Sequence, residues 1–330
     1  MDRYEYIPQE SGYKNPLTRE FSTADPCIVY SKAHGCYYGT YTGNKTLTLH
    51  RAQRLGDMFS RSESTVIYQA DAADDTYGYL WAPELHFIGG KWYIYTSTRQ
   101  SEENLHFKHL ICLRARTDDP FDGFELAGHI NHDTLAIDPT IYQDRENGKM
   151  YLCCSIVDSD RRQKLTIQQL KSPAEPMGEP VIISQAEYPW EMVPPYVNER
   201  TILEGAYFVR KGERLFIVYS ANGCWSDDYV LGVLEFTGGN MLSPDCWHKH
   251  EKPLMTKGNE NFGPGHATFF YSPDETELWI CHHCLKQSDP ECVPMPRYCH
   301  CQKVFFDEND FPHLSVPVPT DTFYAPPSGE

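Results

Sequence analysis

Short runs of aromatic and aliphatic residues, separated by turns, recur along the whole chain. One type of run is the most regular. It occurs five times, each time beside a turn that contains Gly, Asn, Asp or Pro. The five runs are His34–Thr42, Gly90–Thr98, Gly148–Ser155, Gly212–Ser220 and Thr276–Cys284. A strand-like segment precedes each turn and another follows each run, which predicts antiparallel meanders with short connections. A fourth, outer strand in each unit has no clear pattern in the sequence.

One chemically distinctive residue stands about ten positions ahead of each run. These residues are Asp25, Trp81, Asp138, Glu204 and His266. Their spacing of 56 to 66 residues, carried by short strands, is typical of stacked or radial repeats. We therefore predict an all-β chain folded as a five-bladed β-propeller, with blades that open near these five residues. The first strand of each blade would line the centre of the ring, so that the five residues converge on one axis.

The repeat covers the chain, which predicts a single domain over residues 1–330. Aromatic residues make up 13% of the sequence and Gly and Pro are frequent throughout, as expected for strands joined by turns. Tyr13–Thr23 is expected to close the ring by joining the last blade. The tail from His313 to Glu330 is rich in Pro, Ser and Thr, and we expect little strand in it.

The charge balance restricts the partners. The chain has 29 Lys and Arg residues against 46 Asp and Glu residues, a net charge of −17. Such a surface repels phosphate backbones and anionic lipids, so we expect neither nucleic acid nor a membrane as partner, and a neutral substrate fits better. No stretch is long and apolar enough to span a bilayer, and Met1–Glu10 is polar rather than signal-like. These features predict a cytoplasmic protein for the chain as written, or a secreted one if a leader preceded it.

Cysteines raise the alternative of a zinc protein. Five of the twelve lie between Cys281 and Cys301, together with three histidines. Cys281 and Cys284 have zinc-like spacing. On a strand, however, residues three apart point to opposite faces, so these two thiols would not reach one ion. We therefore favour small buried side chains over a zinc site.

Asp25, Asp138 and Glu204 are the right number and type of groups for cleaving an acetal between two sugars. One acid protonates the leaving oxygen, and a second carboxylate acts as nucleophile or as base on a water molecule. In the inverting reaction the two carboxyl groups lie about 6.5–9.5 Å apart to admit that water. A third carboxylate nearby raises the pKa of the acid by like-charge repulsion and keeps it protonated.

Each of the five residues also has an ordinary structural interpretation. Asp25 and Asp138 precede prolines and Glu204 precedes a glycine, as in common turns. Trp81 is compatible with a core position, and His266 with a buried, hydrogen-bonded histidine. The acids recur at the same phase of the repeat, and turns do not require acids there. This recurrence favours a catalytic role for the three acids over a purely structural one. A propeller that only binds its ligand would not need three acids.

Five motifs, in order, resemble the blade-opening motifs of glycoside hydrolase family 43. They are Ala24-Asp25-Pro26, Trp81-Ala82-Pro83-Glu84, Ile137-Asp138-Pro139-Thr140, Glu204-Gly205 and Gly263-Pro264-Gly265-His266. The resemblance extends from about Asn15 to about Pro312. It implies an inverting propeller enzyme that acts on arabinose- and xylose-containing glycans. The substrate would be a neutral plant-type oligosaccharide or polysaccharide, and no cofactor would be needed for the chemistry.

The resemblance also implies roles. Asp25 would be the general base, Glu204 the general acid, and Asp138 the residue that tunes the pKa of the acid and orients it. Trp81 would line the subsite of the cleaved sugar. His266 matches the family's axial histidine, which is often associated with a calcium or sodium ion.

A sixth residue, in the last blade, also resembles a residue of the family. Arg297 resembles an arginine that reaches into the pocket, and a surface ion pair is the alternative. Within the family, three motifs resemble the exo-acting α-L-arabinofuranosidase branch that trims α-1,5-arabinan. They are Trp81–His86, Pro189–Glu191, and Ser220–Asn222 with the following Tyr229–Leu234.

Two departures from the family pattern bear on the substrate. Gly-Ala-Tyr follows Glu204 where many relatives have Gly-Pro, and the C-terminal β-sandwich of many relatives has no counterpart in this sequence. We expect release of terminal α-L-arabinofuranosyl residues. A β-xylosidase or an endo-α-1,5-arabinanase on the same scaffold is the alternative.

Overall fold

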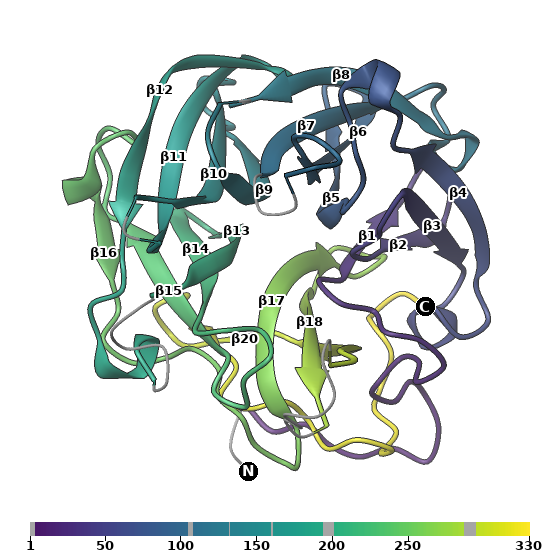
Figure 1. Ribbon diagram of the computed structural model, residues 1–330. Helices are drawn as coiled ribbons and strands as arrows, with labels where there is room; N and C mark the ends of the chain where they lie inside the picture. The colour runs from purple at the N-terminus through teal and green to yellow at the C-terminus, as the bar shows by residue number, and fades with distance from the viewer. Residues whose placement is uncertain (1–3, 105–107, 132, 160, 194–200, 287–294) are drawn as a thin grey trace.

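The computed structural model describes residues 4–104, 108–131, 133–159, 161–193, 201–286 and 295–330. Nearly all regular structure in these residues is strand, in five antiparallel sheets arranged as a ring around a common centre (Figure 1). The predicted all-β, five-bladed propeller is confirmed.

Within each blade the strands follow chain order from the centre outward. The first blade contains β1 (Cys27–Ser31), β2 (Cys36–Thr40), β3 (Thr46–Ala52) and β4 (Glu63–Gln69). The second contains β5 (Trp81–Ile88), β6 (Lys91–Arg99), β7 (Lys108–Ala115) and β8 (Phe124–Ile130). The third contains β9 (Ala136–Gln143), β10 (Met150–Val157), β11 (Gln163–Ser172) and β12 (Glu175–Ser184). The fourth contains β13 (Leu203–Lys211), β14 (Arg214–Ala221), β15 (Val230–Phe236) and β16 (Trp247–Lys249).

The described part of the fifth blade has three strands, β17 (Phe262–Tyr271), β18 (Leu278–Leu285) and β19 (Tyr298–Lys303). A two-stranded hairpin follows, made of β20 (Phe305–Phe306) and β21 (Pro312–His313). The short 3₁₀ turns are η1 (Leu55–Asp57), η2 (Ala72–Asp74), η3 (Pro120–Asp122), η4 (Pro189–Glu191) and η5 (Pro244–Cys246).

The apolar core lies between neighbouring blades. One cluster joins Tyr38 and Leu47 of the first blade to Leu85 and Ile111 of the second. Middle strands such as β2 and β18 are buried at every position, because both faces of a blade pack on other parts of the ring. This explains why the five aromatic runs are continuous rather than alternating.

A left-handed residue occurs where each first strand reaches the centre. The residues with positive φ are Asp25 (54°), Ala82 (47°), Asp138 (57°), Gly205 (56°) and His266 (50°). In blades two and four, therefore, the equivalent residue is the one that follows Trp81 and Glu204. The prediction that all five distinctive residues share one phase of the repeat is wrong by one position in these two blades. The pairing register shifts nearby in β5, β13 and β17, as expected for a local bulge.

The N-terminal segment closes the ring along the outer edge of β19. Leu17 N–H donates to the Cys299 carbonyl at 2.9 Å, and Thr23 N–H donates to that of Arg297 at 2.8 Å. The segment thus lies where other blades have their fourth strand, which confirms the closure by Tyr13–Thr23. The tail contains little strand, as expected, and Tyr324 N–H returns to the Tyr13 carbonyl at 2.8 Å.

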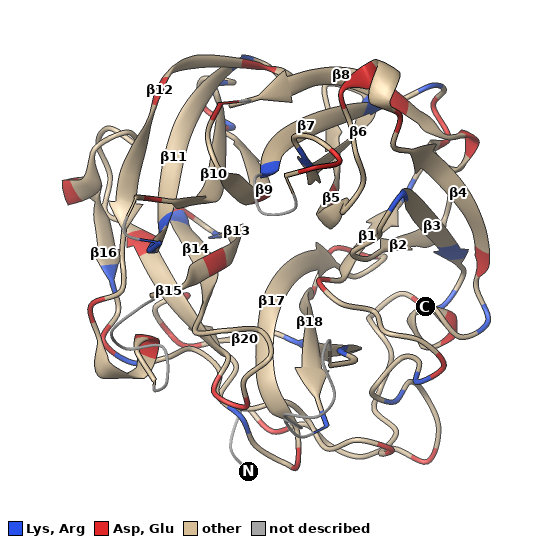
Figure 2. Cartoon of the chain, viewed as in Figure 1, with Lys and Arg blue, Asp and Glu red and all other residues tan. Residues whose placement is uncertain are grey.

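Acidic residues are spread over the outer strands and connecting loops, with Lys and Arg interspersed among them (Figure 2). In the described part of the chain, no helix has the length and apolarity that crossing a membrane would take.

Candidate active site

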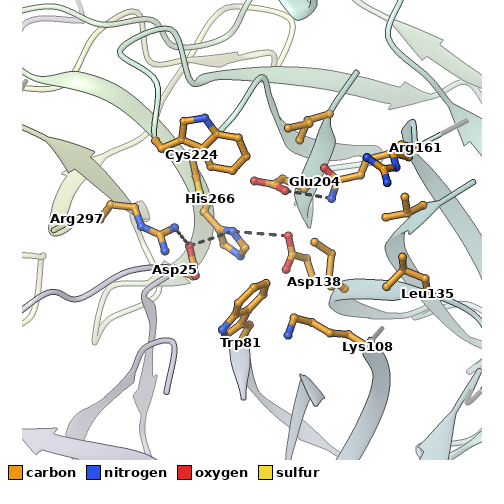
Figure 3. Close-up of a pocket in the computed structure, with 15 residues that line it drawn as sticks. Asp25, Trp81, Lys108, Leu135, Asp138, Arg161, Glu204, Cys224, His266 and Arg297 are labelled. Carbon is orange, nitrogen blue, oxygen red and sulfur yellow. Dashed lines mark hydrogen bonds and ion pairs between the residues drawn. The ribbon is translucent and has the colours of Figure 1, made fainter. Parts of the chain in front are cut away.

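The six residues singled out from the sequence border one pocket near the centre of the ring (Figure 3). They are Asp25, Trp81, Asp138, Glu204, His266 and Arg297. The pocket holds about 660 Å³, a usual size for a small-molecule site. They meet because the first strand of every blade faces the centre, while Arg297 reaches in from the segment before β19.

Asp25 is a buried carboxylate with several donors. Arg297 Nη1 lies 2.7 Å from Oδ1, and the Thr42 hydroxyl donates to Oδ2. Burial alone would raise the pKa of Asp25, but the charge of Arg297 holds it well below its ordinary value. Asp25 is therefore ionised at neutral pH. Arg297 thus forms an ion pair inside the pocket rather than on the surface.

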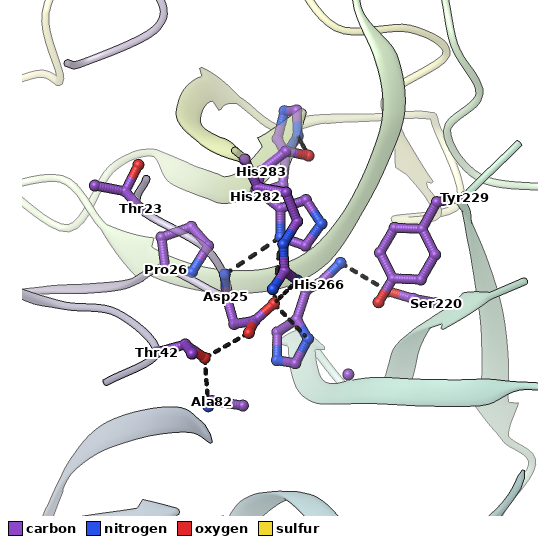
Figure 4. A network of polar contacts seen from close by, with 12 residues as sticks. Thr23, Asp25, Pro26, Thr42, Ala82, Ser220, Tyr229, His266, His282 and His283 are labelled. Atoms are coloured by element: carbon purple, nitrogen blue, oxygen red, sulfur yellow. Dashed lines mark hydrogen bonds and ion pairs between the residues drawn. The ribbon is translucent and has the colours of Figure 1, made fainter. Parts of the chain in front are cut away.

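Backbone contacts fix the left-handed turn at Asp25 (Figure 4). Its N–H donates to His283 Nδ1 at 3.3 Å. Burial, with the charge of Arg297, lowers the pKa of His283 well below its ordinary value, so the imidazole is neutral and free to accept. Thr42 Oγ1 also accepts the N–H of Ala82 at 2.9 Å, which ties Asp25 to the second blade.

Glu204 carries its carboxyl group at the second position of β13, 9% exposed. It accepts hydrogen bonds from Tyr229 Oη at 2.9 Å and Gln163 Nε2 at 3.3 Å. Burial and the negative charge of Asp25 raise the pKa of Glu204 to about 7, although the Tyr229 hydrogen bond and Arg297 oppose the rise. Glu204 is thus poised to carry a proton near neutral pH.

Asp138 competes with Glu204 for that proton. Burial, then the charges of Glu204 and Asp25, raise the pKa of Asp138 well above its ordinary value. One oxygen accepts the N–H of Gly205 at 3.1 Å, which links this carboxyl group to the strand that carries Glu204. Because two adjacent buried carboxylates repel each other, the pair retains a proton at neutral pH while Asp25 does not.

His266 lies between the two aspartates. Its Nδ1 is 3.4 Å from Asp25 Oδ1 and 3.9 Å from Asp138 Oδ2, and its backbone N–H donates to Ser220 Oγ at 2.7 Å. Burial lowers the pKa of His266 despite the opposing charge of Asp25, so the imidazole is neutral. A Cβ atom on Gly205 would come within 3.1 Å of this ring, so glycine permits the close approach.

A calcium ion takes six to eight oxygen ligands. In the described part of the chain, the one group of three His, Cys, Asp or Glu ligand atoms close enough to share an ion consists of thiols and does not include His266. The calcium or sodium ion expected near His266 stays a prediction.

Trp81 forms part of the pocket wall and is half-buried. Its indole packs edge-on against Tyr79 at 5.8 Å, and Lys108 Nζ lies 3.7 Å from the centre of its ring.

Sequence reasoning missed the rest of the lining. The additional residues are Lys108, Leu135, Ile137, Val157, Arg161, Gln163, Ile202, Cys224 and Trp225. Ile137 lies on the first strand β9, directly before Asp138, and the others lie on second and third strands or in loops. Only the closed ring brings them together at the pocket. Tyr229 and His283, which contact Glu204 and Asp25, were missed for the same reason.

The thiols near the end of the chain form an unexpected group. The Sγ atoms of Cys281, Cys299 and Cys301 lie within 4.8 Å of one another in the apolar core, with Cys281 and Cys299 at 3.3 Å. Cys284 points elsewhere and contacts His282 at 3.6 Å, so the Cys281–Cys284 pair does not converge, as expected from strand geometry. Cys292 lies outside the described residues.

The fold and the acids at its centre define a glycoside-cleaving enzyme. Residues 13–312 match the family "Glycosyl hydrolases family 43", and the chain belongs to this family of glycoside hydrolases. Enzymes of this family need no cofactor for their chemistry.

Named relatives come from bacteria and fungi. The chain is 33% identical to an extracellular exo-α-(1→5)-L-arabinofuranosidase of Streptomyces chartreusis, over 84% of this chain and 83% of that protein. The chain is also 29% identical to an α-L-arabinofuranosidase of Humicola insolens. That match covers 93% of this chain and 64% of the longer Humicola enzyme.

Solved structures agree on the architecture. An α-L-arabinofuranosidase from Lactobacillus brevis superposes with a TM-score of 0.83 at 25% identity, covering 94% of this chain and 98% of that one. An endo-arabinase from Bacteroides thetaiotaomicron superposes with a TM-score of 0.70 at 18% identity, over 92% of this chain and all of the other, and shares the fold.

Proposed function

We propose that this chain is an inverting exo-glycosidase that releases terminal α-L-arabinofuranosyl residues from arabinan or arabino-oligosaccharides. The observation that carries the proposal is one pocket that holds an ionised Asp25 opposite a carboxyl pair that keeps a proton. The activities for which the Streptomyces and Humicola relatives are named support the choice of sugar.

In this proposal, Glu204 donates the shared proton to the glycosidic oxygen as the bond from that oxygen to the anomeric carbon breaks. Asp25 accepts a proton from a water molecule, whose oxygen attacks the anomeric carbon from the opposite face. The products are an alcohol and a sugar of inverted anomeric configuration. In this proposal Asp138 tunes the acid as the neighbour that shares its proton and, through Gly205 N–H, positions the strand that carries Glu204.

The sharpest test replaces the acid. Glu204→Gln should lower kcat/KM on an α-1,5-arabino-oligosaccharide by about 10²–10⁴-fold. The loss should be smaller on an aryl α-L-arabinofuranoside, because a phenolate leaves with little help from an acid. Glu213→Gln is the matched control, since the Glu213 side chain is 91% exposed. Unchanged hydrolysis of the oligosaccharide by Glu204→Gln would defeat the acid assignment.

A substrate panel separates this proposal from its alternatives. Aryl β-xylosides and internally labelled arabinan test for a xylosidase and an endo-arabinanase, and a binding module would turn over none of these substrates. NMR of the first-formed sugar should show the inverted anomer, and a retained anomer would contradict the base role of Asp25.

The ion expected near His266 is a separate part of the proposal. The mechanism passes no step through a calcium or sodium ion at this place. A melting temperature and kcat/KM that stay unchanged after dialysis against a chelator would reduce a calcium ion there to an incidental solvent ligand. A loss that calcium restores would establish a functional ion.

A further inference from the structure

Lys108, the first residue of β7, lines the same pocket and has no place in the mechanism above. The residue is only 3% exposed. Its Nζ lies 3.7 Å from the ring centre of Trp81 and 4.8 Å from that of Tyr79 (Figure 3). Among the described residues it has no hydrogen-bond partner.

A buried lysine is normally paired, because an ammonium ion is costly to remove from water. Lysines at a surface extend their ammonium group to solvent, and this one ends against the Trp81 ring in the wall of the pocket. Within the described ranges, no carboxylate forms an ion pair with it. Burial, and then the like charge of Arg99, lower the pKa of Lys108 to about 8, so it is charged at neutral pH. The aromatic rings of Trp81 and Tyr79 stabilise the charge but use none of its three N–H donors.

The charges of the pocket decide which ligand these donors suit. Arg297 neutralises Asp25, and the Glu204–Asp138 pair retains one proton and one negative charge. Lys108 and Arg161, which both line the pocket, set two positive charges against that negative charge, so the pocket's own carboxylates do not use up the donors of Lys108. A sugar hydroxyl is a neutral acceptor of the required kind.

We infer that Lys108 binds substrate by donating a hydrogen bond to a hydroxyl group of the sugar held in the pocket. This inference rests on the proposed function for the identity of the sugar. It assigns Lys108 to sugar recognition, with the Trp81 ring as the platform that holds the ammonium group in place.

The test uses Lys108→Met, which keeps an unbranched chain and removes the charge and the donors. On an aryl α-L-arabinofuranoside, kcat/KM should fall about 10- to 100-fold, the usual loss for a hydrogen bond to a charged group. Lys171→Met, at a side chain that is 66% exposed, should leave it unchanged. An unchanged value in Lys108→Met would overturn the inference.

Deoxy substrates identify the contact. Each sugar hydroxyl is replaced in turn by hydrogen, and wild type and Lys108→Met are compared as a double-mutant cycle. One deoxy substrate should be poor for the wild type and no poorer than the parent for Lys108→Met. If the effects of Lys108→Met and of the deoxy substitution on kcat/KM were fully additive for every hydroxyl, a direct contact would be contradicted.

Stability separates binding from support of the fold. Because Lys108→Met removes an unpaired buried charge, its melting temperature should equal or exceed that of the wild type. A fall of several degrees together with equal losses on all substrates would assign Lys108 a structural role and overturn the inference.

Direct binding distinguishes this inference from the proposed function. Calorimetry would measure L-arabinose, D-xylose and D-galacturonate on wild type and Lys108→Met. If the wild type hydrolyses no arabinofuranoside, the proposed function fails. A neutral sugar that binds the wild type and loses affinity in Lys108→Met would still support the role of Lys108. Equal affinities, no binding of a neutral sugar, or Lys108-dependent binding of galacturonate alone would overturn it.

Discussion

Arg297 is the residue on which the ionisation of Asp25 depends. Its guanidinium lies 2.7 Å from the carboxylate, within a site where burial would otherwise favour the protonated form. A base must be deprotonated to act, so the low pKa of Asp25 predicts no acidic limb in the usual assay range. An acid must be protonated, so kcat/KM should fall as pH rises through about 7, the pKa of Glu204.

Arg297→Met should therefore move the pH profile upward. Loss of the positive charge raises the pKa of Asp25, and an acidic limb should enter the assay range after a shift of about 1–3 units. The alkaline limb should move up by less, because Arg297 is only a minor influence on the pKa of Glu204. The measurement is kcat/KM against pH, with Arg297→Lys as the control that retains the charge. A profile identical to that of the wild type would show that Arg297 does not govern the base.

At the scale of elements, the turn η4 (Pro189–Glu191) and the end of β14 form one interlocked support beside the pocket. Asn222 Nδ2 donates to the Trp190 carbonyl at 2.9 Å. Glu191 accepts from Tyr219 Oη at 2.7 Å and from Lys249 Nζ of β16 at 3.0 Å. None of these residues lines the pocket. Pro189–Glu191 and Ser220–Asn222, two of the motifs that resemble the exo-acting branch, thus support the structure next to the site.

Glu191→Ala should destabilise the protein by about 3–5 kcal/mol, because it leaves the buried Lys249 charge unpaired. The double variant Glu191→Leu with Lys249→Met should recover much of that loss. Glu175→Ala is the control, since the Glu175–Lys171 pair is more than half exposed and contributes little. Denaturant unfolding measures all three. Equal stability of Glu191→Ala and Glu175→Ala would contradict the buried-pair argument.

At the scale of the molecule, closure of the ring depends on contacts between residues nearly 300 positions apart. The side-chain amide of Asn15 pairs with both backbone groups of Cys301. Its Nδ2 donates to the Cys301 carbonyl at 2.7 Å, and its Oδ1 accepts the Cys301 N–H at 2.9 Å. Both residues are fully buried. The N-terminal segment therefore covers the edge of β19, which would otherwise present unpaired backbone groups.

Asn15→Leu should lower the free energy of unfolding by about 2–6 kcal/mol, since two buried backbone groups lose their partner. The folded fraction should keep its kcat/KM, because Asn15 does not line the pocket. Thermal unfolding and active-site titration together measure both quantities. An unchanged melting temperature would show that the ring closes without this contact.

The sequence by itself determined the architecture, because strands, turns and their period are local properties. Five aromatic runs with turn residues at regular spacing leave few folds other than a propeller. The same period singled out Asp25, Asp138 and Glu204, since acids at repeated positions are not needed by turns. Outer strands were missed because they are partly exposed, as in β4 and β12, and so lack a strong apolar pattern.

Only the tertiary structure decided how the pocket residues differ in position and in ionisation. The offset of Trp81 and Glu204 by one position is visible only in the folded backbone, because no residue pattern announces it. Lys108, Tyr229 and His283 reach the centre because blades close on one another. Asp25 and Glu204 are both buried carboxyl groups, and their pKa values separate because only Asp25 contacts Arg297. Ionisation depends on neighbours in space, and those neighbours come from opposite ends of the chain.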